Sequence, residues 1–301
     1  MPAEFTQRFW STLTDSDIRQ ILQIALSEDL DAAGDLTSLA MIPHDAEGTA
    51  EIVSRSAGIL AGAPLIPQIL MSVDRRIDWM PDIADSDALL PGTRVGTMSG
   101  FARSLLAAER TVLNFIGRLS GIASLTHQFV TAVQGTPAKI YDTRKTTPGW
   151  RLLEKYAVRC GGGTNHRSGL YDAVLIKDNH LAFGRQENRC FSPAEAVRKA
   201  KDFLKQHHYS MIVEIEADTL DQLREVLPEE PHIVLLDNMQ PEQIAEAVKI
   251  RNQINPHVQL EASGGVHLKT VRSIAETGVE RISAGALTHS AVSLDFGLDW
   301  I

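Results

Sequence analysis

The second half of the chain alternates short apolar runs with helical stretches, and this alternation limits the possible folds more than any other feature. The runs that predict strands are residues 139–142, 172–177, 210–215, 232–236, 258–261 and 281–283. Strand and helix units repeated at this length predict a parallel sheet. Charged or glycine-rich residues follow one end of successive runs, which favours closure of the sheet into an α/β barrel.

The first part of the chain predicts a smaller α/β domain. Its strand patterns lie at 48–54, 58–62, 76–81 and 94–99. Helical spacing of apolar residues occurs around them, most strongly at 102–119. A chain of 301 residues suits a barrel with an added domain. We therefore expect an N-terminal α/β domain over residues 1–118, joined by the tail at 290–301, and a barrel domain over residues 119–289.

Basic residues gather within 138–183. Arg144 and Lys145 follow one expected strand, Lys177 ends another, and Arg167 comes after a run of three glycines. In α/β barrels the carboxyl ends of the strands carry the chemistry. The whole chain is acidic, with a formal net charge of -9, so a local basic pocket predicts a small polyanionic ligand. Nucleic acid would require a long basic face, and no such run of Lys and Arg occurs in the sequence.

Three motifs in this stretch are DTRKTTPG at 142–149, CGGGTNHR at 160–167 and LIKDNH at 175–180. Together they resemble the signature of the quinolinate phosphoribosyltransferase family, and the resemblance extends in order from Glu28 to Ser290. It implies an α/β fold in which an incomplete (β/α) barrel accompanies an N-terminal α/β sandwich-like domain. It also implies transfer of a phosphoribosyl group from phosphoribosyl pyrophosphate to quinolinate. This reaction releases pyrophosphate and carbon dioxide and yields nicotinate mononucleotide for NAD biosynthesis.

The resemblance implies that a cluster of cations binds quinolinate, whose two adjacent carboxylates favour bidentate partners. The positions that match the family's quinolinate site are Arg110, Thr143, Arg144, His166, Arg167 and Lys177. For His166 the alternative is that a residue after a glycine run only holds its loop. In the family, the arginine that matches Arg110 reaches into the site of the partner subunit. The resemblance therefore implies a homodimer with shared sites, and a higher oligomer is compatible with it.

The sugar donor needs Mg2+ on its pyrophosphate, and this ion prefers carboxylates and water as ligands. Glu216 and Asp237 each end an apolar strand and match the family's acidic pair, so they are the expected metal ligands. Glu214 has the same strand parity as Glu216 and is the alternative, but the family spacing to Asp237 favours Glu216. Lys145 and Lys177 are expected to face the pyrophosphate. The expected catalytic residues are thus Lys145, Lys177, Glu216 and Asp237.

Two glycine-containing strand ends come last in the barrel. Loops after the final strands of barrels often bind a phosphate through backbone N–H groups. His289 matches a family position near this region, without a defined role. The residues expected to bind the phosphoribosyl group are Lys145, Ser263, Gly264, Gly265, Ala284, Gly285, Ala286 and His289.

The expected reaction needs no protein nucleophile, because the pyridine nitrogen attacks the anomeric carbon as pyrophosphate leaves. Lys177 is a candidate for the group that protonates the ring carbon after decarboxylation. Three alternative functions remain open. Lys177 could be the Schiff-base lysine of an aldolase-like enzyme, the chain could be a related pyrophosphorylase that acts on another aromatic acid, or it could be a non-catalytic sensor of phosphate ligands.

Nothing in the sequence predicts export or a membrane span. The start contains acidic residues without a basic region and an apolar core, and no apolar stretch approaches the roughly 20 residues that a membrane helix requires. The only two cysteines, Cys160 and Cys190, argue against a disulfide framework. Buried packing explains Cys160 better than nucleophilic catalysis does. We therefore expect a cytoplasmic protein with small-molecule substrates and no membrane or nucleic-acid partner.

Overall fold

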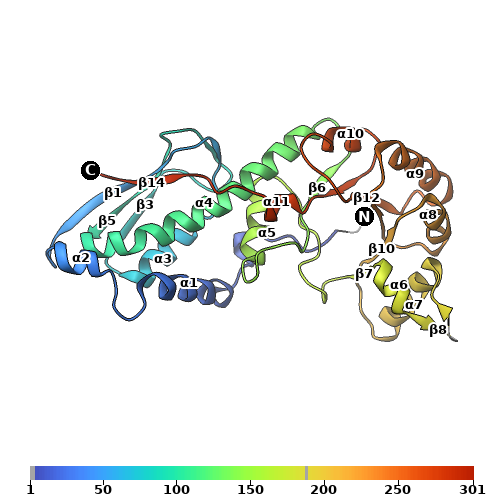
Figure 1. The fold of residues 1–301 in the computed structure, drawn as a ribbon, viewed down its shortest axis with the longest axis horizontal. Coiled ribbons are helices and arrows are strands. Elements are labelled where there is room, and N and C mark those ends of the chain that lie inside the picture. Colours follow the sequence, from blue (N-terminus) through green and yellow to red (C-terminus); the bar gives the residue numbers. More distant parts are fainter. Residues whose placement is uncertain (1–3, 187–188) are drawn as a thin grey trace. The chain divides into compact units, whose positions relative to one another are not determined.

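The computed structural model describes residues 4–186 and 189–301, which form two compact units (Figure 1). The barrel unit contains residues 4–7, Gln128–Lys145 and Gly163–Ala286. The sandwich unit contains Arg8–His127, Thr146–Gly162 and Leu287–Ile301. None of the helices in the described part of the chain combines the length and the apolar character that a membrane crossing requires.

The sandwich unit is built on an antiparallel sheet in the strand order β14-β1-β5-β3. The C-terminal segment belongs to this sheet, because β14 pairs antiparallel with β1. The strands of the unit are β1 (Glu47–Ser54), β3 (Asp78–Pro81), β5 (Arg94–Phe101) and β14 (Phe296–Trp300), with a separate pair formed by β2 (Gly58–Ile59) and β4 (Ala88–Leu89). Its helices are η1 (Trp10–Thr12), α1 (Asp15–Leu30), α2 (Leu36–Met41), α3 (Leu65–Val73) and α5 (Arg151–Cys160), together with the start of α4 (Ala102–Ala132).

Helix α4 continues beyond the end at residue 119 that the apolar pattern predicts. Ile122 and Phe129 are buried and extend the apolar stripe, so the helix is stable as far as Ala132. Gly121 lies within this helix for a packing reason. A Cβ atom there would come within 2.1 Å of the carbonyl oxygen of Val292, so only glycine allows the chain to pass this close.

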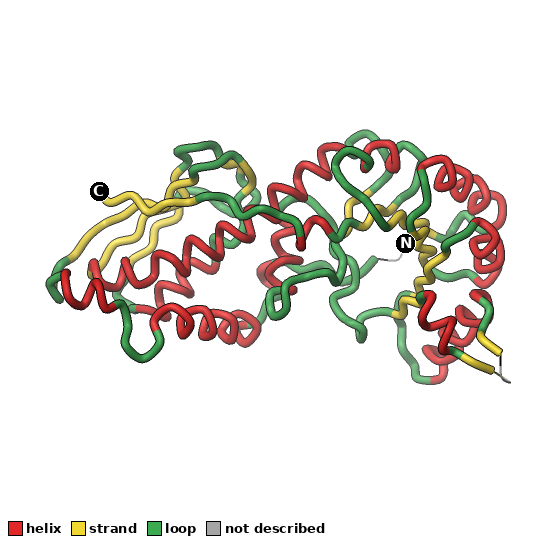
Figure 2. The backbone as a smooth tube through the Cα atoms, viewed as in Figure 1, coloured by secondary structure: helices red, strands yellow, loops and turns green. Residues whose placement is uncertain are grey.

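The barrel unit contains a parallel sheet in the order β6-β13-β12-β11-β10-β7, with helices outside the strands (Figure 2). Among the described residues its edge strands β6 and β7 do not pair with each other, so the barrel is incomplete, as the resemblance implied. The strands are β6 (Lys139–Tyr141), β7 (Val174–Ile176), β10 (Val213–Ala217), β11 (Ile233–Asp237), β12 (Gln259–Ser263) and β13 (Arg281–Ser283). The remaining elements of the unit are α6 (Asp178–Phe183), β8 (Arg185–Gln186), β9 (Arg189–Cys190), α7 (Pro193–Gln206), α8 (Leu220–Val226), η2 (Leu227–Glu229), α9 (Pro241–Ile254) and α10 (Val271–Ala275). Helix α11 (Ala286–His289) begins at the last residue of the barrel unit, and its other residues belong to the sandwich unit.

Residues 146–162 belong to the sandwich unit, although the sequence-based division places them in the barrel domain at 119–289. Their contacts explain this difference. Arg118 on α4 lies 2.8 Å from a carboxylate oxygen of Glu154 on α5, and Glu154 also accepts a hydrogen bond from the backbone of Thr147 at 3.1 Å. A buried charge needs such partners, so Arg118 and Glu154 hold this segment in place.

Candidate active site

The carboxyl ends of β7, β10 and β11 bring one lysine and three carboxylates together. Lys177 follows β7, and its Nζ lies 2.5 Å from Oε2 of Glu216 in β10. One carboxylate oxygen from each of Glu216, Asp218 and Asp237 lies within 4.8 Å of the other two. This rim cluster of Glu216, Asp218 and Asp237 contains both expected metal ligands. It adds Asp218, which sequence reasoning missed although it has the same parity as Glu216.

The rim cluster has the donor set and the electrostatics of a site for a hard divalent cation. Burial raises the pKa of Glu216, the ion pair with Lys177 opposes this shift, and Asp237 and Asp218 add to it. Carboxylate oxygens at this spacing are the ligands that Mg2+ prefers, and a cation among them would offset their mutual repulsion. These residues therefore fit the metal that the family implies.

Two arginines of the barrel unit, Arg144 and Arg167, form no ion pair with any carboxylate that the structure describes. Arg167 is 5% exposed, and its guanidinium donates to the carbonyl oxygen of Ala173 at 3.1 Å. Burial and the nearby charge of Arg144 lower the pKa of Arg167. The Nε atom of Arg144 is buried and has no hydrogen-bond partner among the described residues, and neither arginine has a carboxylate within ion-pair distance there. Two neighbouring cations with no carboxylate at ion-pair distance among the described residues are arranged for a ligand that supplies two negative charges.

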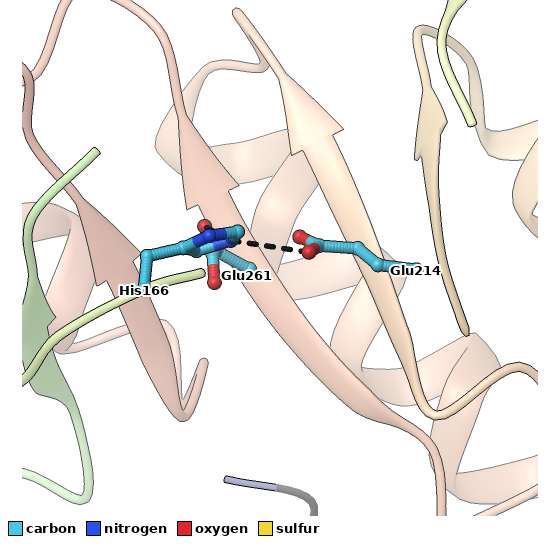
Figure 3. A group of neighbouring side chains, drawn as sticks. All are labelled: His166, Glu214 and Glu261. Carbon is cyan, nitrogen blue, oxygen red and sulfur yellow. Dashed lines mark ion pairs between the residues drawn. The ribbon is translucent and has the colours of Figure 1, made fainter. Parts of the chain in front are cut away.

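His166 is buried inside the barrel and faces two carboxylates from different strands (Figure 3). Its Nε2 lies 3.1 Å from Oε2 of Glu214 in β10 and 3.5 Å from Oε1 of Glu261 in β12. Its Nδ1 accepts a hydrogen bond from the backbone N–H of Arg167 at 2.8 Å. An accepting Nδ1 assigns the proton of the neutral ring to Nε2, which then points at Glu214.

The interior cluster of His166, Glu214 and Glu261 is therefore unsuited to a metal ion. A metal bound at Nε2 of His166 would require the proton on Nδ1, where it would oppose the N–H of Arg167. Glu261 already has a cationic partner, since it accepts a hydrogen bond from Nε of the fully buried Arg281 at 2.9 Å. The structure thus distinguishes Glu214 from Glu216, which strand parity alone could not do. Glu214 lies in the interior cluster and Glu216 in the rim cluster.

The two strand ends expected to hold a phosphate differ in backbone conformation, and only the turn after β12 has positive φ values. Gly264 and Gly265 follow β12 with φ values of +89° and +59°, a region that favours glycine. A Cβ atom on Gly264 would lie 2.2 Å from Oδ1 of Asn238, so this turn passes close to the end of β11. Ala284 follows β13, and its backbone N–H donates to the carbonyl oxygen of Tyr141 at 3.0 Å.

The remaining predicted residues divide between the units. Thr143 accepts a hydrogen bond from the backbone of Lys145 at 3.0 Å, and both lie at the carboxyl end of β6 in the barrel unit. Arg110 and His289 belong to the sandwich unit. The Arg110 side chain is 65% exposed on α4 and pairs with Glu109 at 2.9 Å, while His289 lies 2.7 Å from the hydroxyl of Ser290.

Cys160 lies in the sandwich unit and has no nucleophilic character. Burial and the nearby carboxylate of Asp85 raise the pKa of its thiol to about 12. The thiolate is the nucleophilic form, so this cysteine is unreactive at neutral pH. Cys160 is half-buried rather than fully buried, and its protonated thiol agrees with the expectation that it is not a nucleophile.

Comparisons with known proteins identify the family of the chain. The model of the quinolinate phosphoribosyl transferase C-terminal domain matches residues 122–299, and that of the N-terminal domain matches residues 35–120. Nicotinate-nucleotide pyrophosphorylase (carboxylating) of Mycobacterium leprae is 44% identical over 285 residues, which cover 93% of this chain and 96% of the relative. The chloroplastic protein of that name from Arabidopsis thaliana is 41% identical over 300 residues, covering 94% and 82%. The structure of nicotinate-nucleotide pyrophosphorylase from Francisella tularensis superimposes with a TM-score of 0.88 at 36% identity, covering 98% of this chain and 100% of that one. The chain therefore belongs to the quinolinate phosphoribosyl transferase family.

Proposed function

We propose that the protein transfers a phosphoribosyl group from phosphoribosyl pyrophosphate to quinolinate with loss of carbon dioxide. The products are nicotinate mononucleotide and pyrophosphate, in the biosynthesis of NAD. One observation carries this proposal beyond the family. The neighbouring cations Arg144 and Arg167 have no carboxylate at ion-pair distance in the described chain, and the adjacent carboxylates of quinolinate supply two.

The acceptor half of the site binds quinolinate. Arg144 and Arg167 hold its carboxylates. Thr143 and Lys177 lie near the carboxyl ends of β6 and β7, and His166 directly precedes Arg167 in the chain. Arg110 completes the pocket from the partner subunit of a homodimer. Its exposed position on α4 leaves it available for this contact.

The donor half binds phosphoribosyl pyrophosphate. Glu216 and Asp237 hold Mg2+, with Asp218 near enough to contribute a water-mediated contact. When bound, the ion would neutralise charge on the pyrophosphate as it leaves. Lys145 assists at the pyrophosphate. The 5-phosphate is held by the turns that follow β12 and β13, which comprise Ser263, Gly264, Gly265, Ala284, Gly285 and Ala286, with His289 nearby in the sequence.

The protein's contribution to the chemistry is orientation and charge. The arginines aim the pyridine nitrogen at the anomeric carbon, and the lysines stabilise negative charge on the departing pyrophosphate. The glycosylated ring nitrogen is then cationic and stabilises the electron pair that remains on the adjacent ring carbon when carbon dioxide leaves, and this carbon then takes up a proton. Lys177 is the proposed donor of the proton to that ring carbon, because it is held at the rim by Glu216. The cytoplasm is the proposed compartment.

Product analysis tests the proposed function. The protein is mixed with phosphoribosyl pyrophosphate, Mg2+ and either quinolinate, nicotinate or benzoate. Nicotinate mononucleotide and carbon dioxide from quinolinate alone are the expected products. Product from nicotinate or benzoate instead would establish a related pyrophosphorylase. No product with any acid would favour the sensor, and trapping of a carbonyl substrate on Lys177 by borohydride would favour the aldolase-like enzyme.

Replacing Glu216 or Asp237 with alanine is expected to impair the magnesium-dependent step while quinolinate still binds. Each change removes a carboxylate ligand from the rim cluster and leaves Arg144 and Arg167 intact. Steady-state kinetics against Mg2+ and calorimetry with quinolinate measure the two halves separately. Asp221→Ala is the control, since its side chain is 93% exposed on α8. Loss of quinolinate binding with normal use of the donor would show that the two halves had been exchanged.

A further inference from the structure

The loop that carries Arg167 is held by side chains rather than by a helix or a strand. Residues 165–167 have no regular secondary structure. Four consecutive backbone N–H groups, of residues 165–168, each donate to a side chain. The acceptors are Gln7 Oε1 for Asn165 (2.8 Å), Asp142 Oδ1 for His166 (2.9 Å), His166 Nδ1 for Arg167 (2.8 Å) and Asp172 Oδ2 for Ser168 (2.7 Å).

Gln7 differs from the other three acceptors, because it comes from the start of the chain. Its carboxamide binds both backbone groups of Asn165. Nε2 donates to the carbonyl oxygen at 3.1 Å, and Oε1 accepts from the N–H. A neighbouring β-strand would provide the same pair of hydrogen bonds to a residue at a sheet edge. At this point of the incomplete barrel, the Gln7 side chain therefore makes the two backbone hydrogen bonds that a neighbouring strand would make.

The segment before Gln7 is anchored firmly enough to hold that side chain in place. Phe5 is 5% exposed, and its ring centre lies 4.3 Å from that of His166. Glu4 accepts hydrogen bonds from the hydroxyl of Tyr141 at 3.0 and 3.1 Å and from Nζ of Lys139 at 3.0 Å. The terminal arm of residues 4–7 is thus fastened to the barrel unit by apolar packing and by hydrogen bonds.

We propose that Gln7 is a positioning residue of the quinolinate site, which acts by fixing the loop that aims Arg167. The guanidinium of Arg167 is already tied to Ala173, so a shift of the loop at Asn165 would change where the charge is presented. A misplacement of about 1 Å is enough to weaken an oriented contact strongly. This inference rests on the proposed function, because quinolinate is the ligand that Arg167 binds.

Gln7→Ala in the full-length protein is the test. It removes two hydrogen bonds to Asn165, so we expect the KM for quinolinate to rise roughly tenfold. We expect kcat and the KM for phosphoribosyl pyrophosphate to stay within about twofold, because the rim cluster keeps its own contacts. Gln68→Ala is the matched control, since Gln68 is also half-buried but lies on α3 of the sandwich unit.

Two further variants distinguish a role of Gln7 in positioning Arg167 from a role in the stability of the fold alone. Gln7→Glu keeps the acceptor for Asn165 N–H and loses the donor, so its KM should lie between wild type and Gln7→Ala. In an Arg167→Lys background, Gln7→Ala should have a much smaller effect on the quinolinate KM, because the two residues act through one contact. Additive effects of Gln7→Ala and Arg167→Lys would overturn the proposal, as would equal rises in both KM values.

Calorimetry with quinolinate keeps the two proposals apart. If the wild type binds quinolinate and Gln7→Ala binds it with the same affinity, the positioning role is overturned and the proposed function is not. A wild type that binds no quinolinate would overturn the proposed function and this inference together. Hydrogen exchange gives an independent measurement, since the amide of Asn165 should exchange faster in Gln7→Ala than in wild type if the carboxamide holds the loop.

Discussion

Arg144→Ala and Arg167→Ala are each expected to abolish useful affinity for quinolinate while the protein stays folded. Each change removes a cation whose carboxylate partner is the ligand itself, and charge-assisted contacts of this kind contribute roughly 1.5 to 3 kcal/mol. That corresponds to roughly a 10- to 150-fold loss in affinity for each arginine. Calorimetric titration with quinolinate measures the loss. Binding unchanged within error in either variant would remove that arginine from the site.

Arg144→Ala, which should weaken quinolinate binding, should leave the stability of the folded protein unchanged or raise it. Burial and the charge of Arg144 both lower the pKa of Arg167, which means that the folded protein holds these cations close together at a cost. Arg144→Ala relieves the repulsion, so its Tm should equal or exceed that of wild type. Arg224→Ala is the control, because Arg224 is 49% exposed and is paired with Asp221 at 2.8 Å. The two arginines would then lower the stability of the empty site and at the same time be required for quinolinate binding, which is a trade-off between stability and activity.

The sequence predicted the architecture well because local patterns determine it. Short apolar runs followed by charged residues located the parallel strands, and the motif around Arg144 and the motif around Lys177 fall at carboxyl ends of those strands. The strand boundaries shifted by a few residues. The strand expected at 210–215, for example, forms at Val213–Ala217, where the backbone finds partners in β7 and β11.

The sequence could not predict how deep in the barrel a side chain lies. Strand parity determines which side of the sheet a residue faces, but not its position between the interior and the rim. Glu214 and Glu216 point to the same side of β10, yet one meets His166 in the interior and the other meets Lys177 at the rim. The sequence also contained an indication at Glu261 that the sequence analysis did not use. A carboxylate within an apolar strand is expected to be buried and therefore to need a buried cation as its partner. That cation, Arg281, comes from the neighbouring strand.

Contacts between distant parts of the chain were beyond the reach of sequence patterns. Gln7 is 158 residues away from Asn165, and nothing in the composition of the first residues distinguishes a glutamine that supports a loop from one in solvent. The grouping of residues 146–162 with the sandwich unit has the same origin, because it depends on Arg118 and Glu154 forming a pair across 36 residues. Such pairings depend on the folded geometry and have no local period.

A mixture of two inactive variants should regain activity if the proposed homodimer shares its sites. Arg110 belongs to the sandwich unit and Lys177 to the barrel unit. Arg110→Ala and Lys177→Ala are each expected to be inactive, because each homodimer then lacks one of the two residues at both sites. In a mixed dimer, one site receives an intact arginine and an intact lysine. Activity in the donor and quinolinate assay, measured after subunit exchange, is the readout.

The size of the recovery distinguishes the possible arrangements of Arg110. With random exchange about half of the dimers are mixed, and each mixed dimer has one good site of two, so activity should approach roughly a quarter of wild type. The exposed side chain of Arg110 contacts Glu109 within its own helix, a pair that contributes little to stability and leaves the guanidinium free to cross an interface. Mixing either variant with Arg110→Ala/Lys177→Ala is the control, since no dimer in that mixture contains an intact site. If subunit exchange is demonstrated and activity does not return, Arg110 acts within its own chain or takes no part in the reaction, and the sites are not shared.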